Sequence, residues 1–252
     1  MAFFCLLLYI TAIYLRPAEW IPIFYGWQMM DILTTVAVAS LMLTLMMKKK
    51  FDTFKAPQNK LMLGLFLAFL LSHVAHTYFA GLMMTFGEFF KIVVTYFLFV
   101  LIINSERKFK ITIYLLILLT LLLAIQGIYQ FNTGYGWAGQ RLIYNPHEPN
   151  VPGRIIWISI FGDPNDLGLA FVLVASILIA FLFGKTKFIS KLITIPILGY
   201  LLYALYLTNS RGALLALMAA GAFYFIKKSK KLVFGIIIGV LFIGLVFALG
   251  PS

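Results

Sequence analysis

Residues 153–168 read GRIIWISIFGDPNDLG and lead directly into an apolar run of about 18 residues, the length of a membrane span. An arginine, two aspartates and an asparagine therefore stand at the mouth of a transmembrane helix. Ionisable groups are costly there and commonly functional. A purely structural interpretation is also open, in which Asp163 caps the helix and Pro164 occupies its first position. That interpretation explains neither Arg154 nor Arg211.

The composition of the whole chain is that of a membrane protein. Of its 252 residues, 63% are hydrophobic and 11% are charged, and the mean hydropathy is +1.01. Several further apolar runs exceed the roughly 18 residues that span a bilayer. We therefore expect an all-α polytopic membrane protein with a single transmembrane domain over residues 1–252. Cys5 is the one cysteine and lies in an apolar run, so the sequence predicts no intrachain disulfide.

About nine transmembrane helices are expected, the first of them short. They cover approximately residues 2–15, 28–47, 61–79, 85–103, 111–130, 163–183, 192–207, 212–226 and 232–249. The longest non-apolar segment, residues 131–154, separates the fifth helix from the sixth. It is rich in Gly, Pro, Asn and aromatic residues and is too polar to span a bilayer.

The net charge of +12 is explained by membrane topology rather than by nucleic-acid binding. Of the 20 Lys and Arg residues, 15 lie in four short loops that alternate with the other connections and can share one side. By the positive-inside rule this side is the cytoplasm, so we expect a cytoplasmic N-terminus and a periplasmic C-terminus. Arg16 disagrees with this count. If the first run is only re-entrant, the N-terminus moves outside and nothing else changes.

The choice between arginine and lysine differs between the two faces. The four basic loops contain 14 Lys and one Arg, whereas the opposite face contains Arg16, Arg141, Arg154 and Arg211. Either residue satisfies the topology rule, but only arginine has a planar fork that binds phosphate or carboxylate through two parallel hydrogen bonds. The pattern predicts a phosphate-bearing lipid as ligand. Ordinary pairing of arginine with the aspartates of residues 153–168 is the alternative.

Other polar residues give weaker signals. His73 and His76 can share a helix face, but two histidines without a firm third ligand rarely bind metal, so we expect no metal site. Glu88 and Lys91 are three residues apart and are expected to form a buried ion pair. No motif for a cofactor is present.

In the outer loop, His147 and Glu148 can act as a general base. The alternative is that both are solvated loop residues without a chemical role.

Three short motifs resemble a known family. Residues 161–168 read FGDPNDLG and residues 208–213 read TNSRGA; with Arg154 before them, they resemble the O-antigen ligase and polymerase family. These are bacterial inner-membrane glycosyltransferases of the Wzy-C type. Residues 15–20 read LRPAEW and are similar to the exosortase-associated O-glycosylation ligase branch. The resemblance covers about residues 10–225.

The resemblance implies a metal-independent transfer of a glycan from undecaprenyl diphosphate to an acceptor at the periplasmic face. The acceptor would be a glycolipid, a polysaccharide or a protein, and membrane lipids would surround the enzyme. Arg154 and Arg211 would bind the diphosphate and stabilise it as leaving group. The substrate-binding candidates are Arg16, Arg141, Asp163, Asn165, Asp166 and Ser210, and the catalytic candidates are Arg154, Arg211 and His147.

The chain departs from the family at its end. Family members continue into a large periplasmic loop that carries a catalytic histidine, and then into further spans, whereas this sequence ends at Ser252. We therefore expect an N-terminal portion in which the base is missing unless His147 or Glu148 substitutes. This portion alone is expected to bind the lipid carrier weakly and to turn over slowly or not at all.

Alternative functions remain open from the sequence. A polysaccharide polymerase of the same family would use the same donor. A transporter or flippase of a lipid-linked anionic substrate should show discontinuous helices in two matching halves, but no internal repeat is found. A non-catalytic scaffold would not need arginine on the outer face.

Overall fold

The computed structural model describes residues 1–46, 56–144, 152–184 and 187–229. These residues form helices joined by loops, and two isolated antiparallel bridges are the β pairings among them. The helices are α1 (Ala2–Leu15), α2 (Pro17–Trp20), α3 (Met29–Met46), α4 (Pro57–Ala75), α5 (Phe79–Ile102), α6 (Glu106–Thr133), α7 (Pro164–Phe183), α8 (Phe188–Leu207) and α9 (Arg211–Ser229), with short 3-10 turns η1 (Pro22–Phe24) and η2 (Ser159–Phe161).

The chain is a multi-pass helical membrane protein, as expected from its composition. In the described part, six stretches are long and apolar enough to cross a membrane: α1 with α2, α4, α5, α6, α7 and α8. The apolar parts of α3 and α9 are shorter. The first eight expected runs are thus helical, and the ninth, residues 232–249, lies outside the described residues.

Several expected helix ends are wrong by a few residues. Helix α4 begins at Pro57 rather than at residue 61, because proline suits the first helical position and Asn59 finds a partner. The hydroxyl of Tyr96 donates to Asn59 Oδ1 at 2.8 Å. Helices α5 and α8 likewise begin earlier than expected, and α6 is longer at both ends.

The loop expected over residues 131–154 begins later in the structure, because α6 is longer than expected. The helix continues to Thr133 and stops at Gly134, whose φ of 83° is readily adopted only by glycine. The Gly134 amide donates to the Gln130 carbonyl at 2.8 Å and closes the last turn.

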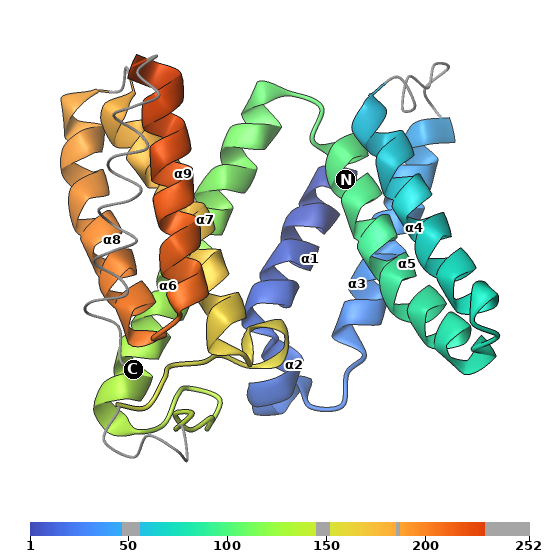
Figure 1. Cartoon of the computed structure of the whole chain (residues 1–252), viewed down its shortest axis with the longest axis horizontal. Coiled ribbons are helices and arrows are strands. Elements are labelled where there is room, and N and C mark those ends of the chain that lie inside the picture. The colour runs from blue at the N-terminus through green and yellow to red at the C-terminus, as the bar shows by residue number, and fades with distance from the viewer. Residues whose placement is uncertain (47–55, 145–151, 185–186, 230–252) are drawn as a thin grey trace. The chain divides into compact units, whose positions relative to one another are not determined.

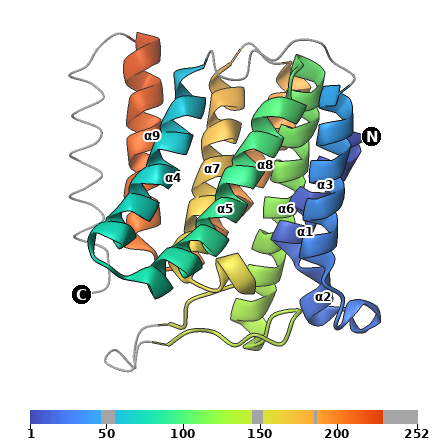
Figure 2. The same cartoon turned by 90° about the vertical axis from the view of Figure 1, so that its right-hand side faces the viewer.

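Contacts between Cα atoms divide the chain into two units, with boundaries inside α1 and α6. Unit 1 comprises Met1–Ile13 and Gln28–Ile113, and unit 2 comprises Tyr14–Trp27 and Tyr114–Ser252. In unit 1, α4 and α5 lie side by side as an antiparallel hairpin, and α3 packs on α5 (Figure 2). The phenylalanine rings of this hairpin pack together, with Phe66 stacked on Phe89 at 5.8 Å between centroids.

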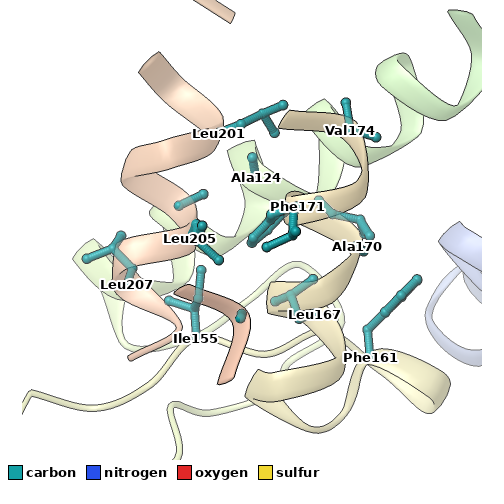
Figure 3. Packing of buried hydrophobic residues seen from close by; sticks show 14 of the residues in the cluster. Ala124, Ile155, Phe161, Leu167, Ala170, Phe171, Val174, Leu201, Leu205 and Leu207 are labelled. Carbon is teal, nitrogen blue, oxygen red and sulfur yellow. The ribbon is translucent and has the colours of Figure 1, made fainter. Parts of the chain in front are cut away.

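In unit 2, α7 packs between α8 and α9, and the three helices run side by side (Figure 1). The apolar core lies on α7, where Phe171 is fully buried among side chains of α6 and α8 (Figure 3). Ile155, from the loop before α7, belongs to the same core near Leu167 and Leu205. The core therefore extends from the helices into the loop that precedes the site.

In unit 2, the directions of the helices place Arg154 and Arg211 at one end and the described lysines toward the other. Helices α6 and α8 end, and α7 and α9 begin, at one end of this unit, which we call the loop end. Residues 134–144 and 152–163 lie there. Lys187, which precedes α8, Lys191 in its first turn and Lys227 near the end of α9 lie toward the other end.

Candidate functional site

Arg154 lies in the loop that leads to α7. Its backbone forms an antiparallel bridge with Ile143: the Arg154 amide donates to the Ile143 carbonyl at 2.8 Å, and the reverse bond is 3.0 Å long. The next residue, Ile155, is fully buried. Arg154 itself is half-buried, so the chain presents the guanidinium at the edge of the core.

The Arg154 guanidinium is held by two uncharged acceptors. Nε donates to the Thr208 carbonyl at 2.8 Å, at the C-terminus of α8, and Nη2 donates to Asn165 Oδ1 at 3.2 Å. Arginine has five N–H donors, so three remain for another partner. Among the described residues, no carboxylate forms an ion pair with Arg154. Pairing with Asp163 or Asp166, the alternative considered from the sequence, is therefore not observed.

Asn165 joins three segments of the chain. Its Oδ1 accepts from Arg154 and also from Ser210 Oγ, at 2.7 Å. Ser210 Oγ in turn accepts from the Ala213 amide at 3.1 Å and so caps α9. The loop, the start of α7 and the start of α9 are thus linked through Asn165 by direct hydrogen bonds. We refer to Arg154, Asn165, Ser210 and Arg211 as the arginine cluster.

Asp163 and Pro164 have the structural role considered from the sequence. Asp163 is the N-cap of α7 and its Oδ1 accepts from the Asn165 amide at 2.6 Å, while Pro164 occupies the first turn. Asp166 is exposed in the same turn, where a negative charge stabilises the positive end of the helix dipole. Capping also fixes the position of Asn165, because the Asn165 amide is the group that Asp163 binds.

Arg211 has the opposite electrostatic setting. It is the first residue of α9, it is exposed, and the first turn of this helix has no acidic residue. A cation near a helix N-terminus is unfavourable by about 0.3–1 kcal/mol. In the part of the chain that the structure describes, no carboxylate pairs with the guanidinium of Arg211. No carboxylate of the described residues therefore compensates this charge at the loop end.

Arg16 and Arg141, the other two arginines that the sequence assigned to the outer face, have local partners. Arg16 Nη1 pairs with Glu19 Oε1 at 3.0 Å, and the Arg141 guanidinium lies 5.3 Å from the centroid of the Tyr135 ring. Neither makes a hydrogen bond or ion pair with the arginine cluster among the described residues. Residues 15–20 instead contact the loop before α7 through Trp20, whose ring lies 5.8 Å from that of Trp157 in a T-shaped contact.

His147 and Glu148, expected as candidates for the general base, lie outside the described residues. The two histidines of unit 1 are bound locally. His73 Nε2 lies 2.8 Å from Thr85 Oγ1, and His76 Nδ1 lies 2.8 Å from the Ser72 carbonyl oxygen. Within the described ranges, His, Cys, Asp and Glu do not gather in groups of three that could hold a metal ion.

Sequence reasoning missed four residues around Arg154. They are Thr208, whose carbonyl binds Arg154, and the glutamines Gln126, Gln130 and Gln140, which hold the adjoining loop. A backbone acceptor such as the Thr208 carbonyl leaves no signal in a sequence. The two helical glutamines did leave one, because they lie four residues apart in an apolar helix and so share a face.

Comparison with known proteins does not assign a family. No family model, no curated protein and no solved structure matches this chain. The similarity to O-antigen ligases therefore rests on the short motifs alone.

Proposed function

We propose that this protein is a membrane glycosyltransferase that transfers a saccharide from undecaprenyl diphosphate to a hydroxyl group of a lipid, polysaccharide or protein. The bacterial inner membrane, with the loop end at the periplasmic face, is its proposed location. The observation that carries the proposal is Arg211, an exposed cation at a helix N-terminus without a carboxylate partner among the described residues. Such a charge lowers stability unless an anionic ligand compensates it.

The diphosphate is the anion that fits this arrangement. Arginine binds phosphate through its planar fork and keeps its proton. Arg211 directly follows Ser210, whose hydroxyl donates to Asn165 Oδ1, the same atom that accepts from Arg154. The two arginines therefore flank one hydrogen-bonded group. Because Arg154 is already held at two of its nitrogens, its free donors require little reorganisation when the ligand binds.

The proposed reaction breaks the bond between the anomeric carbon and the diphosphate oxygen. The acceptor hydroxyl oxygen attacks the anomeric carbon in line, with inversion, and the electron pair of the broken bond leaves on undecaprenyl diphosphate. Negative charge grows on that leaving group, where preorganised positive charge is most effective. A general base takes the hydroxyl proton, and His147 is the candidate that the sequence offers.

Two alternatives use the same lipid-linked anion. A polymerase would differ only in its acceptor, a second lipid-linked glycan. A transporter should carry its polar groups near mid-membrane. In unit 2 the arginine cluster lies at the ends of the helices, which favours transfer at one face.

The proposal is tested by the binding of undecaprenyl diphosphate to the detergent-purified protein. In R211K the positive charge stays and the fork is lost, and among the described residues no hydrogen bond depends on this side chain. We expect binding to weaken by about 1–3 kcal/mol, as for loss of a charge-assisted contact. R107K, at the opposite end of α6, is the matched control and should bind like wild type. Equal binding by R211K and wild type would refute the diphosphate site.

A further inference from the structure

The backbone of residues 154–157 is fixed from four directions. The Arg154 amide donates to the Ile143 carbonyl, the Ile155 amide to Leu207, the Ile156 amide to the side chain of Gln130, and the Trp157 amide to Phe161. A loop at a helix entry normally bonds to water with much of its backbone. This one is bound at four consecutive amides by the 134–144 loop, α8, α6 and η2.

Two buried glutamines of α6 hold the same residue of that loop. Gln130 Oε1 accepts from the Ile156 amide at 2.9 Å, and Gln126 Nε2 donates to the Ile156 carbonyl at 2.9 Å. Both side chains are fully buried, with an exposed fraction of 0%. Because the two glutamines lie one helical turn apart, they share a face of α6.

Gln140 closes the network from the neighbouring loop. The side-chain Nε2 of Gln140 donates to Gln126 Oε1 at 2.8 Å. The backbone carbonyl of Gln140 accepts from Gln130 Nε2 at 3.2 Å. The amide of Ala138 donates to Gln140 Oε1 at 3.0 Å. Each of the three side-chain amides therefore uses both its oxygen and its nitrogen. Fully satisfied polar networks of this kind rigidify the segments that they join.

We propose that Gln126, Gln130 and Gln140, the glutamine clamp, position Arg154 for the diphosphate. The inference rests on the proposed function. Ile156 lies two residues from Arg154, and the clamp fixes both of its peptide groups against α6. The guanidinium is thereby kept within reach of Thr208 and Asn165. The two fully buried amides, of Gln126 and Gln130, are costly to bury for packing alone, because leucine would fill such space without desolvating polar groups. The three glutamines are positioning residues, since they act on the ligand through Arg154.

The test measures undecaprenyl diphosphate binding by Q130L, which removes both bonds of Gln130. We expect a loss of affinity of about tenfold to a hundredfold, as for a displaced binding group. Q130E keeps an acceptor for the Ile156 amide and should bind more tightly than Q130L. T112V removes another buried polar group of α6, outside the clamp, and should bind like wild type.

Non-additivity separates positioning from a general loss of structure. If the clamp acts through Arg154, the double variant Q130L/R154K binds no more weakly than R154K alone. Additive losses, or a Q130L variant that binds like wild type while R154K does not, would overturn the positioning role and leave the proposed function standing. If R211K binds like wild type, the proposed function itself fails.

A second readout needs no ligand. Amide hydrogen exchange of residues 154–157 should be at least about tenfold faster in Q130L than in wild type and T112V. Unchanged exchange in a folded variant would show that the clamp does not hold the loop, whatever the binding results.

Discussion

The ionisable residues of unit 1 and unit 2 are satisfied in different ways. On the α4–α5 hairpin of unit 1, Lys91 pairs with Glu88 three residues away, and His76 binds a carbonyl four residues away. In unit 2, Arg154 binds the carbonyl of Thr208, which is 54 residues away in the sequence. The partners of Lys91 and His76 come from the hairpin itself, whereas the partners of Arg154 require the assembled fold.

The difference also concerns charge. Lys91 lies 3.0 Å from a carboxylate, and both groups are largely exposed, with side-chain exposures of 66% and 78%. The expectation of a buried pair was therefore wrong, although the pair itself forms. Arg154 and Arg211 have no such partner among the described residues. A cation that its own fold leaves uncompensated indicates a ligand, whereas a neutralised pair needs none.

The close packing of α7 against α9 brings the arginine cluster together, and a substitution at Gly168 tests this. A Cβ added at Gly168 would lie 2.7 Å from Ala213 Cβ, so G168A must push the start of α9 away from α7. We expect a loss of about 1–3 kcal/mol of stability, as for overpacking, together with weaker diphosphate binding. Thermal unfolding in detergent and the binding assay would measure both.

Gly199, on α8 of the same unit, provides the matched control. A Cβ there meets no atom within 4 Å. Because alanine has the higher helix propensity, by up to about 1 kcal/mol, G199A should leave the midpoint unchanged or raise it. If G168A and G199A behave alike, the close approach of α7 to α9 is not what assembles the site.

A smaller effect is expected in unit 1. T85V removes the hydroxyl that contacts His73, at a cost of about 0.5–1.5 kcal/mol for one hydrogen bond. Diphosphate binding should be unaffected, because the contact is local to the hairpin. Parallel melting and binding measurements check both statements, and a binding defect in T85V would mean that the two units are not independent in function.

Most helices could be predicted from the sequence, because the apolar runs are long and clearly separated along the chain. The helix α7 was expected from its apolar run, and the structure confirms it. The Asp163 cap, which the sequence left open as a structural alternative, is also observed. Helix ends were less predictable, since the start of α4 at Pro57 depends on a tertiary partner for Asn59.

The arginine cluster was predictable in part. The motifs identified Arg154, Asn165, Ser210 and Arg211, but no residue pattern shows that Arg154 binds neutral acceptors instead of the nearby aspartates. That choice depends on where the C-terminus of α8 lies, which is a tertiary property. The glutamine clamp was not predicted either, because it binds backbone groups of the loop, and such contacts also depend on tertiary structure.

We propose that Arg154, which has no carboxylate partner among the described residues, is compensated by the ligand. N165D tests it directly, because it places a carboxylate where Asn165 Oδ1 now accepts from Arg154 at 3.2 Å and leaves both arginines intact. We predict a folded protein whose affinity for undecaprenyl diphosphate falls by about 1–3 kcal/mol. N132D, the same exchange at an exposed residue near the end of α6, should bind like wild type. If N165D binds the diphosphate as tightly as N132D, the ligand does not compensate the charge of Arg154.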